Sequence, residues 1–93
     1  MSLKSIRKRD GRVVPFEKEK IVSAIYRAAQ AVGGRDYDTA QRLADKVIEL
    51  AGYYYLDDYE IATVEEIQDL VEKVLVKNGH YRTAKAYILY RKQ

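Results

Sequence analysis

Basic side chains near the start of the sequence could hold a phosphate group. The run Arg7-Lys8-Arg9-Asp10-Gly11-Arg12 places cations on both sides of an Asp-Gly dipeptide, and Lys20 follows shortly after it. Ammonium and guanidinium groups bind phosphate through charge-assisted hydrogen bonds, to which the N–H groups of a turn or helix start can add. Ile21, next to Lys20, belongs to an apolar stripe. A nucleotide requires such an arrangement, because its phosphates need cations and its base needs a dry slot.

Charge is distributed unevenly along the 93 residues. Residues 1–35 hold nine basic and three acidic side chains, residues 36–72 hold eleven acidic and two basic ones, and residues 73–93 hold six basic and no acidic ones. A protein that grips a long duplex needs a basic stripe over most of one face. Two basic ends around an acidic middle favour a small anion instead. A nucleic-acid-binding module that uses the basic hairpin is kept as the alternative.

Motifs typical of catalysis or of a structural metal are missing from the sequence. Cysteine is absent and His80 is the one histidine, which excludes disulfides, thiolate zinc sites and histidine-rich metal clusters. There is no glycine-rich loop ending in Gly-Lys-Ser/Thr, no H-E-x-x-H and no nucleophile elbow. We interpret Asp57, Asp58 and Glu60 as a solvated turn rather than a magnesium site. We therefore expect no catalytic residue and no resident metal.

The segment that carries the first cations is predicted to be a β-hairpin. Residues 5–7 and 12–14 flank Asp10-Gly11, a dipeptide that suits a two-residue primed turn. Pro15 has no N–H to donate to a ladder, so the second strand must be short or lie at an edge. A further short strand beside the hairpin is expected at Ile61-Ala62.

Two amphipathic helices are predicted to follow the hairpin. Apolar residues at three-and-four spacing begin just after Glu17 and continue to Gly33-Gly34, which ends the first helix. The second helix is expected to start at Asp38, with Gln41 placed for a capping box. These helices would position Lys20 one turn from the hairpin.

The last third of the chain predicts two more helices. Thr63 and Glu66 form a capping box before an apolar stripe, and Asn78-Gly79 ends that helix. The final helix spans about residues 81–92, and apolar residues lie nearly all around it, so we expect it to be packed on more than one side.

Together these elements predict one α+β domain over residues 1–93, in which a small β-hairpin or three-stranded sheet covers a four-helix bundle. Such a domain could be the N-terminal piece of a larger protein. No apolar run is long enough to span a membrane, and we expect no signal peptide because no apolar stretch follows the first residues. We expect a cytoplasmic protein that does not bind a membrane.

Three segments of the sequence resemble the ATP-cone domain. Residues 6–21 resemble its opening signature, V-x-K-R-D-G-x-x-x-x-F-[DN]-x-x-K-I; residues 63–72 resemble its third-helix segment, and residues 84–91 its closing A-K-x-Y-x-x-Y-R. The resemblance covers about residues 4–92. It implies a non-catalytic regulatory domain that binds ATP or dATP with Mg²⁺. Such domains lie at the amino terminus of many ribonucleotide reductases. They also occur in the reductase-operon repressor, whose zinc ribbon requires cysteines that are absent here.

The resemblance also implies roles for individual residues. Phosphates would be held by Lys8, Arg9, Lys20 and Arg91, and base and ribose would contact Val14, Glu17, Ile21, Thr63, Gln68 and Tyr90. Two of these positions depart from the family pattern, since position 17 is often Asp or Asn and position 14 is acidic in some members. The implied partners are adenine nucleotides, and a reductase catalytic domain or a second copy of the chain. Control would act through oligomeric state, by way of exposed helix faces such as residues 53–55. A ligand-free interaction domain is the remaining alternative.

Overall fold

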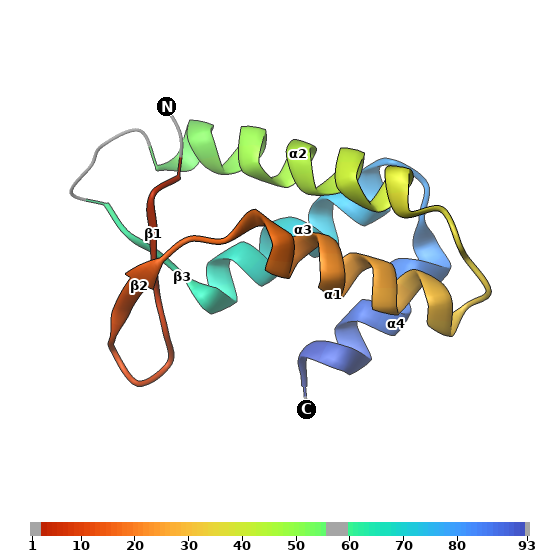
Figure 1. Cartoon of the computed structure of the whole chain (residues 1–93), viewed down its shortest axis with the longest axis horizontal. Helices are drawn as coiled ribbons and strands as arrows, with labels where there is room; N and C mark the ends of the chain where they lie inside the picture. Colours follow the sequence, from red (N-terminus) through yellow and green to blue (C-terminus); the bar gives the residue numbers. More distant parts are fainter. Residues whose placement is uncertain (1–2, 56–59, 93) are drawn as a thin grey trace.

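A computed structural model describes residues 3–55 and 60–92, and within these residues the chain forms four helices and a three-stranded sheet (Figure 1). The predicted α+β class is confirmed. The sheet lies at one end of the molecule and the helices extend away from it. The predicted solvated turn at Asp57 and Asp58 lies outside the described residues.

The sheet consists of β1 (Ser5–Arg7), β2 (Val13–Pro15) and β3 (Ala62–Thr63), in the order β2-β1-β3. β1 is antiparallel to β2 and parallel to β3. The predicted hairpin is therefore confirmed, and the strand expected at Ile61-Ala62 is present one residue further on. A parallel partner from the second half of the chain fixes the hairpin to the helices that follow.

The register of the sheet explains why a proline is tolerated in it. Ile6 of β1 faces Val14 on one side and Ala62 on the other. Pro15 lies in β2, an edge strand of the sheet, where it pairs with Ser5 of β1. A missing N–H at the edge need not remove a ladder hydrogen bond. The expectation for Pro15 is confirmed.

The turn of the hairpin differs from the predicted one. The Lys8 N–H donates to the Arg12 carbonyl at 2.8 Å and the Gly11 N–H donates to the Lys8 carbonyl at 2.9 Å. Gly11 has φ +91° and is therefore left-handed. Asp10 is not, because every described residue with positive φ is a glycine. The connection thus has three residues and closes on a left-handed glycine. The two-residue primed turn was wrong, because the Asp10 carboxylate instead accepts the Arg12 N–H at 3.0 Å across the turn.

The helices are α1 (Lys18–Ala31), α2 (Tyr37–Tyr54), α3 (Val64–Lys77) and α4 (Tyr81–Arg91). Each packs against two others: α1 and α3 both contact α2 and α4. The four helices therefore surround one core, to which each contributes its apolar stripe. Its fully buried large side chains are Val22, Ile25, Val47, Val71 and Leu75.

The second helix starts earlier than the sequence predicts. Asp36 is its N-cap: the carboxylate accepts the Thr39 N–H at 3.1 Å and the Thr39 hydroxyl at 2.8 Å. These two hydrogen bonds from Thr39 lower the pKa of Asp36. A start at Asp38 was wrong, because the helix begins at Tyr37 and its cap is Asp36, which accepts both donors of Thr39.

The third helix starts as predicted. The Glu66 N–H donates to the Thr63 hydroxyl at 3.1 Å and the Thr63 N–H donates to the Glu66 carboxylate at 2.9 Å, which completes the capping box. Thr63 is also the last residue of β3. The sheet therefore leads directly into α3 and positions its first turn beside the hairpin.

The fourth helix is covered on one side only. Thr83, Ala84 and Tyr87 are buried against its neighbours, whereas Tyr81 and Leu89 are 66% and 60% exposed. Our expectation of packing on more than one side was wrong. Single apolar side chains are common on protein surfaces and do not by themselves indicate a buried helix face.

Candidate functional site

A pocket lies where the hairpin meets the helices, and we call it the hairpin pocket. It has a volume of about 210 Å³. β1, β2 and the chain after them form one wall, the first turns of α1 and α3 form the next, and α4 closes it. Its lining consists of Ile6, Lys8, Val14, Pro15, Phe16, Glu17, Lys20, Ile21, Ala24, Val64, Ile67, Gln68, Val71, Tyr87 and Tyr90.

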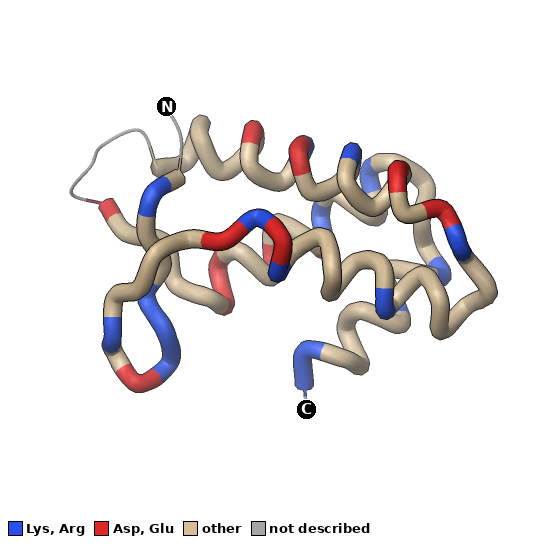
Figure 2. The backbone as a smooth tube through the Cα atoms, viewed as in Figure 1, with Lys and Arg blue, Asp and Glu red and all other residues tan. Residues whose placement is uncertain are grey.

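Seven of the ten residues predicted to form a site line this pocket. They come from four separate segments and are Lys8, Val14, Glu17, Lys20, Ile21, Gln68 and Tyr90. Figure 2 shows basic residues along the hairpin and at the end of α4. Lys8 from the first segment of the chain and Tyr90 from the last segment both line this pocket.

Two lysines supply positive charge at the pocket. Lys8 is half-buried and has no carboxylate within 4.0 Å among the described residues. The Lys20 ammonium lies 3.2 Å from the Glu17 carboxylate, and both side chains are more than half exposed. Exposed ion pairs contribute little free energy. Lys20 can therefore exchange Glu17 for another anion at small cost.

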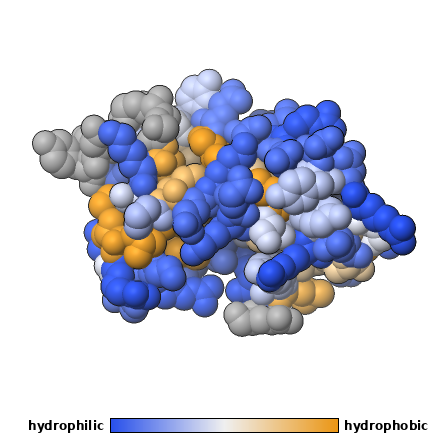
Figure 3. Space-filling view, viewed as in Figure 1, coloured by the Kyte–Doolittle hydropathy of each residue, from blue (hydrophilic) through white to orange (hydrophobic). Residues whose placement is uncertain are grey.

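The remaining lining is mostly apolar and aromatic. Figure 3 shows apolar side chains that reach the surface over the hairpin, with hydrophilic side chains around them. Tyr87 and Tyr90 on α4 have ring centroids 6.1 Å apart. Burial raises the pKa of Tyr87 to about 12, so this side chain stays neutral at physiological pH. Tyr90 also lines the pocket and is 38% exposed, and its ring lies beside that of the buried Tyr87.

One polar atom in this apolar lining has no partner. The side-chain carbonyl oxygen of Gln68 is buried, and no donor among the described residues lies within hydrogen-bond distance of it. An unsatisfied buried acceptor costs about 1–3 kcal/mol. A ligand that brings a hydroxyl or amino donor into the pocket would remove this cost.

Three of the predicted site residues lie outside the pocket lining. Thr63 is occupied in the capping box of α3. The Arg9 guanidinium donates to the Glu65 carboxylate at 2.7 Å, and both side chains are exposed. Arg9 therefore lies beside the start of α3, close to the pocket but held by a carboxylate.

The third, Arg91, is held by several acceptors on α3. Its guanidinium donates to Asp69 at 2.9 Å, to the Glu65 carbonyl at 3.3 Å and to the Glu72 carboxylate, and its side chain is 15% exposed. Burial opposes protonation, but the hydrogen bonds to Asp69 and Glu72 prevail and raise the pKa of Arg91. Glu65 thus receives one arginine from each end of the chain.

Eight lining residues were not predicted as site residues. Val64, Ile67, Val71, Ala24 and Tyr87 belong to apolar helix stripes, which indicate core packing rather than contact with a ligand. Ile6, Pro15 and Phe16 come from the hairpin. All three lie within residues 6–21, which resemble the opening signature, and this resemblance is the signal that could have identified them.

Within residues 3–55 and 60–92, no three carboxylate or histidine side chains gather where they could hold a metal ion. In the same part of the chain, none of the helices is both long and apolar enough to cross a lipid bilayer.

Known proteins contain segments that are similar to this sequence. Residues 4–93 match the model of a family described as "ATP cone domain". A vitamin B12-dependent ribonucleoside-diphosphate reductase of Thermoplasma acidophilum is 48% identical over 96 residues, which cover 98% of this chain and 12% of that protein. An anaerobic ribonucleoside-triphosphate reductase of Escherichia coli is 39% identical over 87 residues, covering 92% of the chain and 11% of the reductase. The alpha subunit of a Chlamydia pneumoniae ribonucleoside-diphosphate reductase is 36% identical over 101 residues, covering 97% and 9%.

The chain spans about a tenth of the length of these relatives. The family match, in contrast, extends over nearly all of the 93 residues and includes the hairpin, the capping box of α3 and the end of α4. The segments included in the family match are also the ones that form the hairpin pocket. The chain belongs to the ATP cone domain family.

Proposed function

We propose that this chain binds ATP or dATP in the hairpin pocket and regulates a ribonucleotide reductase, without catalysis of its own. The observation that carries the proposal is the pocket itself, where Lys8 and Lys20 border an apolar slot closed by Tyr90. At about 210 Å³ the slot is smaller than the roughly 300 Å³ at which sites for whole drug-sized ligands begin. The base therefore occupies the slot, and the triphosphate extends over its basic rim.

In this proposal the base lies between the apolar side chains of Val14 and Ile21 and the ring of Tyr90. Glu17 accepts from the adenine amino group, and the Gln68 oxygen accepts from an amino or hydroxyl group. Thr63 lies at the same end of α3, nearer the ribose. Hydrogen bonds to fixed acceptors give the site its preference for adenine.

The phosphates contact Lys8 and Lys20 first, because these ammonium groups lie at the pocket. Arg9 binds the phosphates only if their oxygens replace the Glu65 carboxylate. Arg91 binds them only if they replace the carboxylates of Asp69 and Glu72. Mg²⁺ arrives with the nucleotide and is bound mainly by phosphate oxygens and water. Glu17 is the one carboxylate in the described lining of the pocket.

Regulation further requires that ATP and dATP favour different arrangements, since a ligand with equal affinity for both states shifts nothing. The 2′-hydroxyl supplies one hydrogen bond, worth about 0.5–1.5 kcal/mol. We propose that this difference is amplified by a change in oligomeric state, in which a helix face such as the one bearing Tyr53 and Tyr54 contacts a second copy or a catalytic domain. Both tyrosines are more than half exposed.

Isothermal titration calorimetry with ATP, dATP, GTP and CTP tests nucleotide binding. We expect adenine nucleotides to bind most tightly. Lys8→Ala and Lys20→Ala should each weaken binding by about 1.5–3 kcal/mol, roughly 10- to 150-fold. Lys85→Ala is the matched control, since Lys85 is exposed on α4 and does not line the pocket. Equal affinity for all four nucleotides, or equal losses in the control, would reduce the site to a non-specific basic patch.

A further inference from the structure

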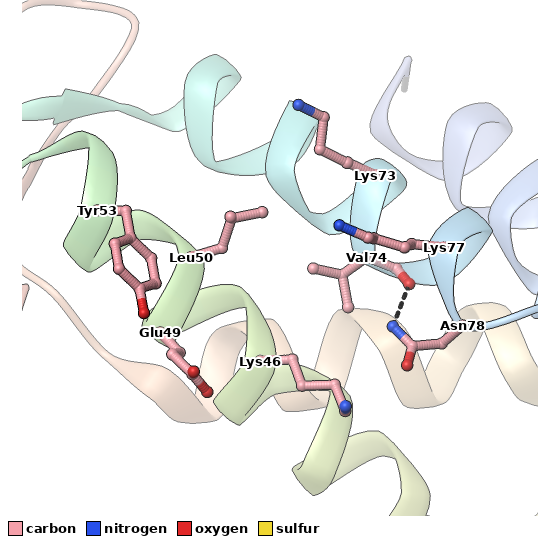
Figure 4. Close-up of a pocket in the computed structure, with 8 residues that line it drawn as sticks. All are labelled: Lys46, Glu49, Leu50, Tyr53, Lys73, Val74, Lys77 and Asn78. Carbon is pink, nitrogen blue, oxygen red and sulfur yellow. Dashed lines mark hydrogen bonds between the residues drawn. The ribbon is translucent and has the colours of Figure 1, made fainter.

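A second depression lies between α2 and α3, on lining residues that it does not share with the hairpin pocket. Its volume is about 420 Å³. Lys46 comes from α2, and Lys73 and Lys77 come from α3 (Figure 4). We call it the lysine groove. Any ligand of this groove would therefore be distinct from the nucleotide proposed above.

The described lining of the lysine groove carries more positive than negative charge. Among the described residues, none of the three lysines has a carboxylate within 4.0 Å. Glu49 is the one acid in the described lining. The neighbouring acids Asp69 and Glu72 are engaged by Arg91. Three cations and one anion give the described lining a net charge of +2, which makes the groove complementary to an acidic partner.

Apolar and aromatic surface accompanies this charge. Leu50 is half-buried and Val74 is buried, and both line the lysine groove. Tyr53 at the rim is 70% exposed and the adjacent Tyr54 is 52% exposed. The Lys73 ammonium lies 5.7 Å from the centre of the Tyr54 ring. Exposed tyrosines beside an apolar floor are typical of protein interfaces rather than of solvated surface.

The arrangement of the lysines indicates the kind of partner. Figure 4 shows that the ammonium groups of Lys46, Lys73 and Lys77 point in different directions and do not meet at one point. A chain segment with several carboxylates along its length can pair with each lysine separately. The groove is also open and runs between two packed helices, as a site for an extended segment requires.

We propose that the lysine groove docks an acidic segment of a protein partner, with its carboxylates paired to Lys46, Lys73 and Lys77 and an apolar side chain placed over Leu50 and Val74.

The test measures fluorescence anisotropy of a fluorescein-labelled peptide that repeats Glu-Glu-Leu-Phe, titrated with the full chain at low and at high salt. We expect saturable binding that weakens with salt. The double variant Lys73→Glu/Lys77→Glu should lose about tenfold in affinity through the lost pairs and the new repulsion. Tyr53→Ser should weaken binding with little change in its salt dependence. Lys85→Glu, an exposed lysine outside the lysine groove, should remain within about twofold of the wild type.

Three results would overturn the proposal. The first is absence of saturable binding at low salt, or equal losses in the Lys85→Glu control. The second is displacement of the peptide by inorganic tripolyphosphate in the Lys8→Ala/Lys20→Ala background, which would assign the lysine groove to phosphate. The third is a wild-type dimer in sedimentation that Lys73→Glu/Lys77→Glu makes monomeric, since the occupant would then be a second copy. Circular dichroism and urea unfolding check that each groove variant is folded, whereas calorimetry with ATP bears on the hairpin pocket alone.

Discussion

Replacing Gln68 by methionine should make the ligand-free protein more stable and its nucleotide complex weaker. The buried carbonyl oxygen of Gln68 has no donor among the described residues, and an unsatisfied acceptor of this kind costs about 1–3 kcal/mol. Methionine has a similar length and no such oxygen. We expect the free energy of unfolding to rise by about 1 kcal/mol, which raises Tm by roughly 4–8 °C for a domain of this size.

The same change removes an acceptor that the proposed ligand uses. One lost hydrogen bond of about 0.5–1.5 kcal/mol weakens ATP binding by roughly 2- to 13-fold. Saturating ATP should therefore stabilise the variant less than it stabilises the wild type, because the stabilisation grows with the logarithm of ligand concentration over Kd.

Urea unfolding and calorimetry, each with and without ATP, measure both halves of this prediction. Gln30→Met is the matched control, since Gln30 is exposed on α1 and should change neither quantity by much. A Gln68→Met protein that is less stable than the wild type without nucleotide would refute the reasoning, because Gln68 would then have a partner that stabilises the fold. Unchanged ATP affinity would separate Gln68 from the ligand.

Three other changes test the contacts around the start of α3. Glu65→Gln should raise nucleotide affinity by up to about fivefold in calorimetry, because it releases Arg9 from an exposed ion pair worth about 0.2–1 kcal/mol; Asp10→Asn, whose carboxylate pairs elsewhere in the hairpin turn, should not. Thr63→Ala should lower the free energy of unfolding by about 0.5–2 kcal/mol in urea titrations, because α3 loses its N-cap. If this free energy falls less than it does in a variant of an exposed residue elsewhere, the capping role is contradicted. The Thr63 N–H lowers the pKa of Glu66 below its usual value of 4.5, so the stability it contributes is present above that pH and lost as pH falls through the lowered pKa. Acid titration by circular dichroism should show this loss in the wild type and a flatter profile in Glu66→Gln, whereas parallel profiles would argue against it.

The sequence predicts most of what positions the pocket, because periodicity and caps are local signals. The stripes of α1, α2 and α3 and the capping box at Thr63 are found where expected. The errors arise where near-equivalent local choices compete. Asp36 and Asp38 are both good N-caps, and in the structure Asp36 takes this position with the Thr39 N–H and hydroxyl as its donors. Apolar residues around α4 cannot reveal which of them a neighbouring helix covers.

The side-chain pairs of the site could not be predicted from the sequence, for a different reason. Glu65 lies 56 positions from Arg9 along the chain and 26 from Arg91, so no local pattern links them. Their pairing follows from how the hairpin and α4 approach the first turn of α3. The orphaned oxygen of Gln68 depends likewise on tertiary packing, because an exposed glutamine at the same place would be satisfied by water.

The double use of Thr63, as the end of β3 and as the cap of α3, limits how the hairpin can move. A slip of one residue between β1 and β3 would turn Ile6 to the opposite face of the sheet, so that it would no longer lie beside Ala62. Because Thr63 is also fixed by the capping box of α3, the position of the hairpin along β3 is set relative to the first turn of that helix.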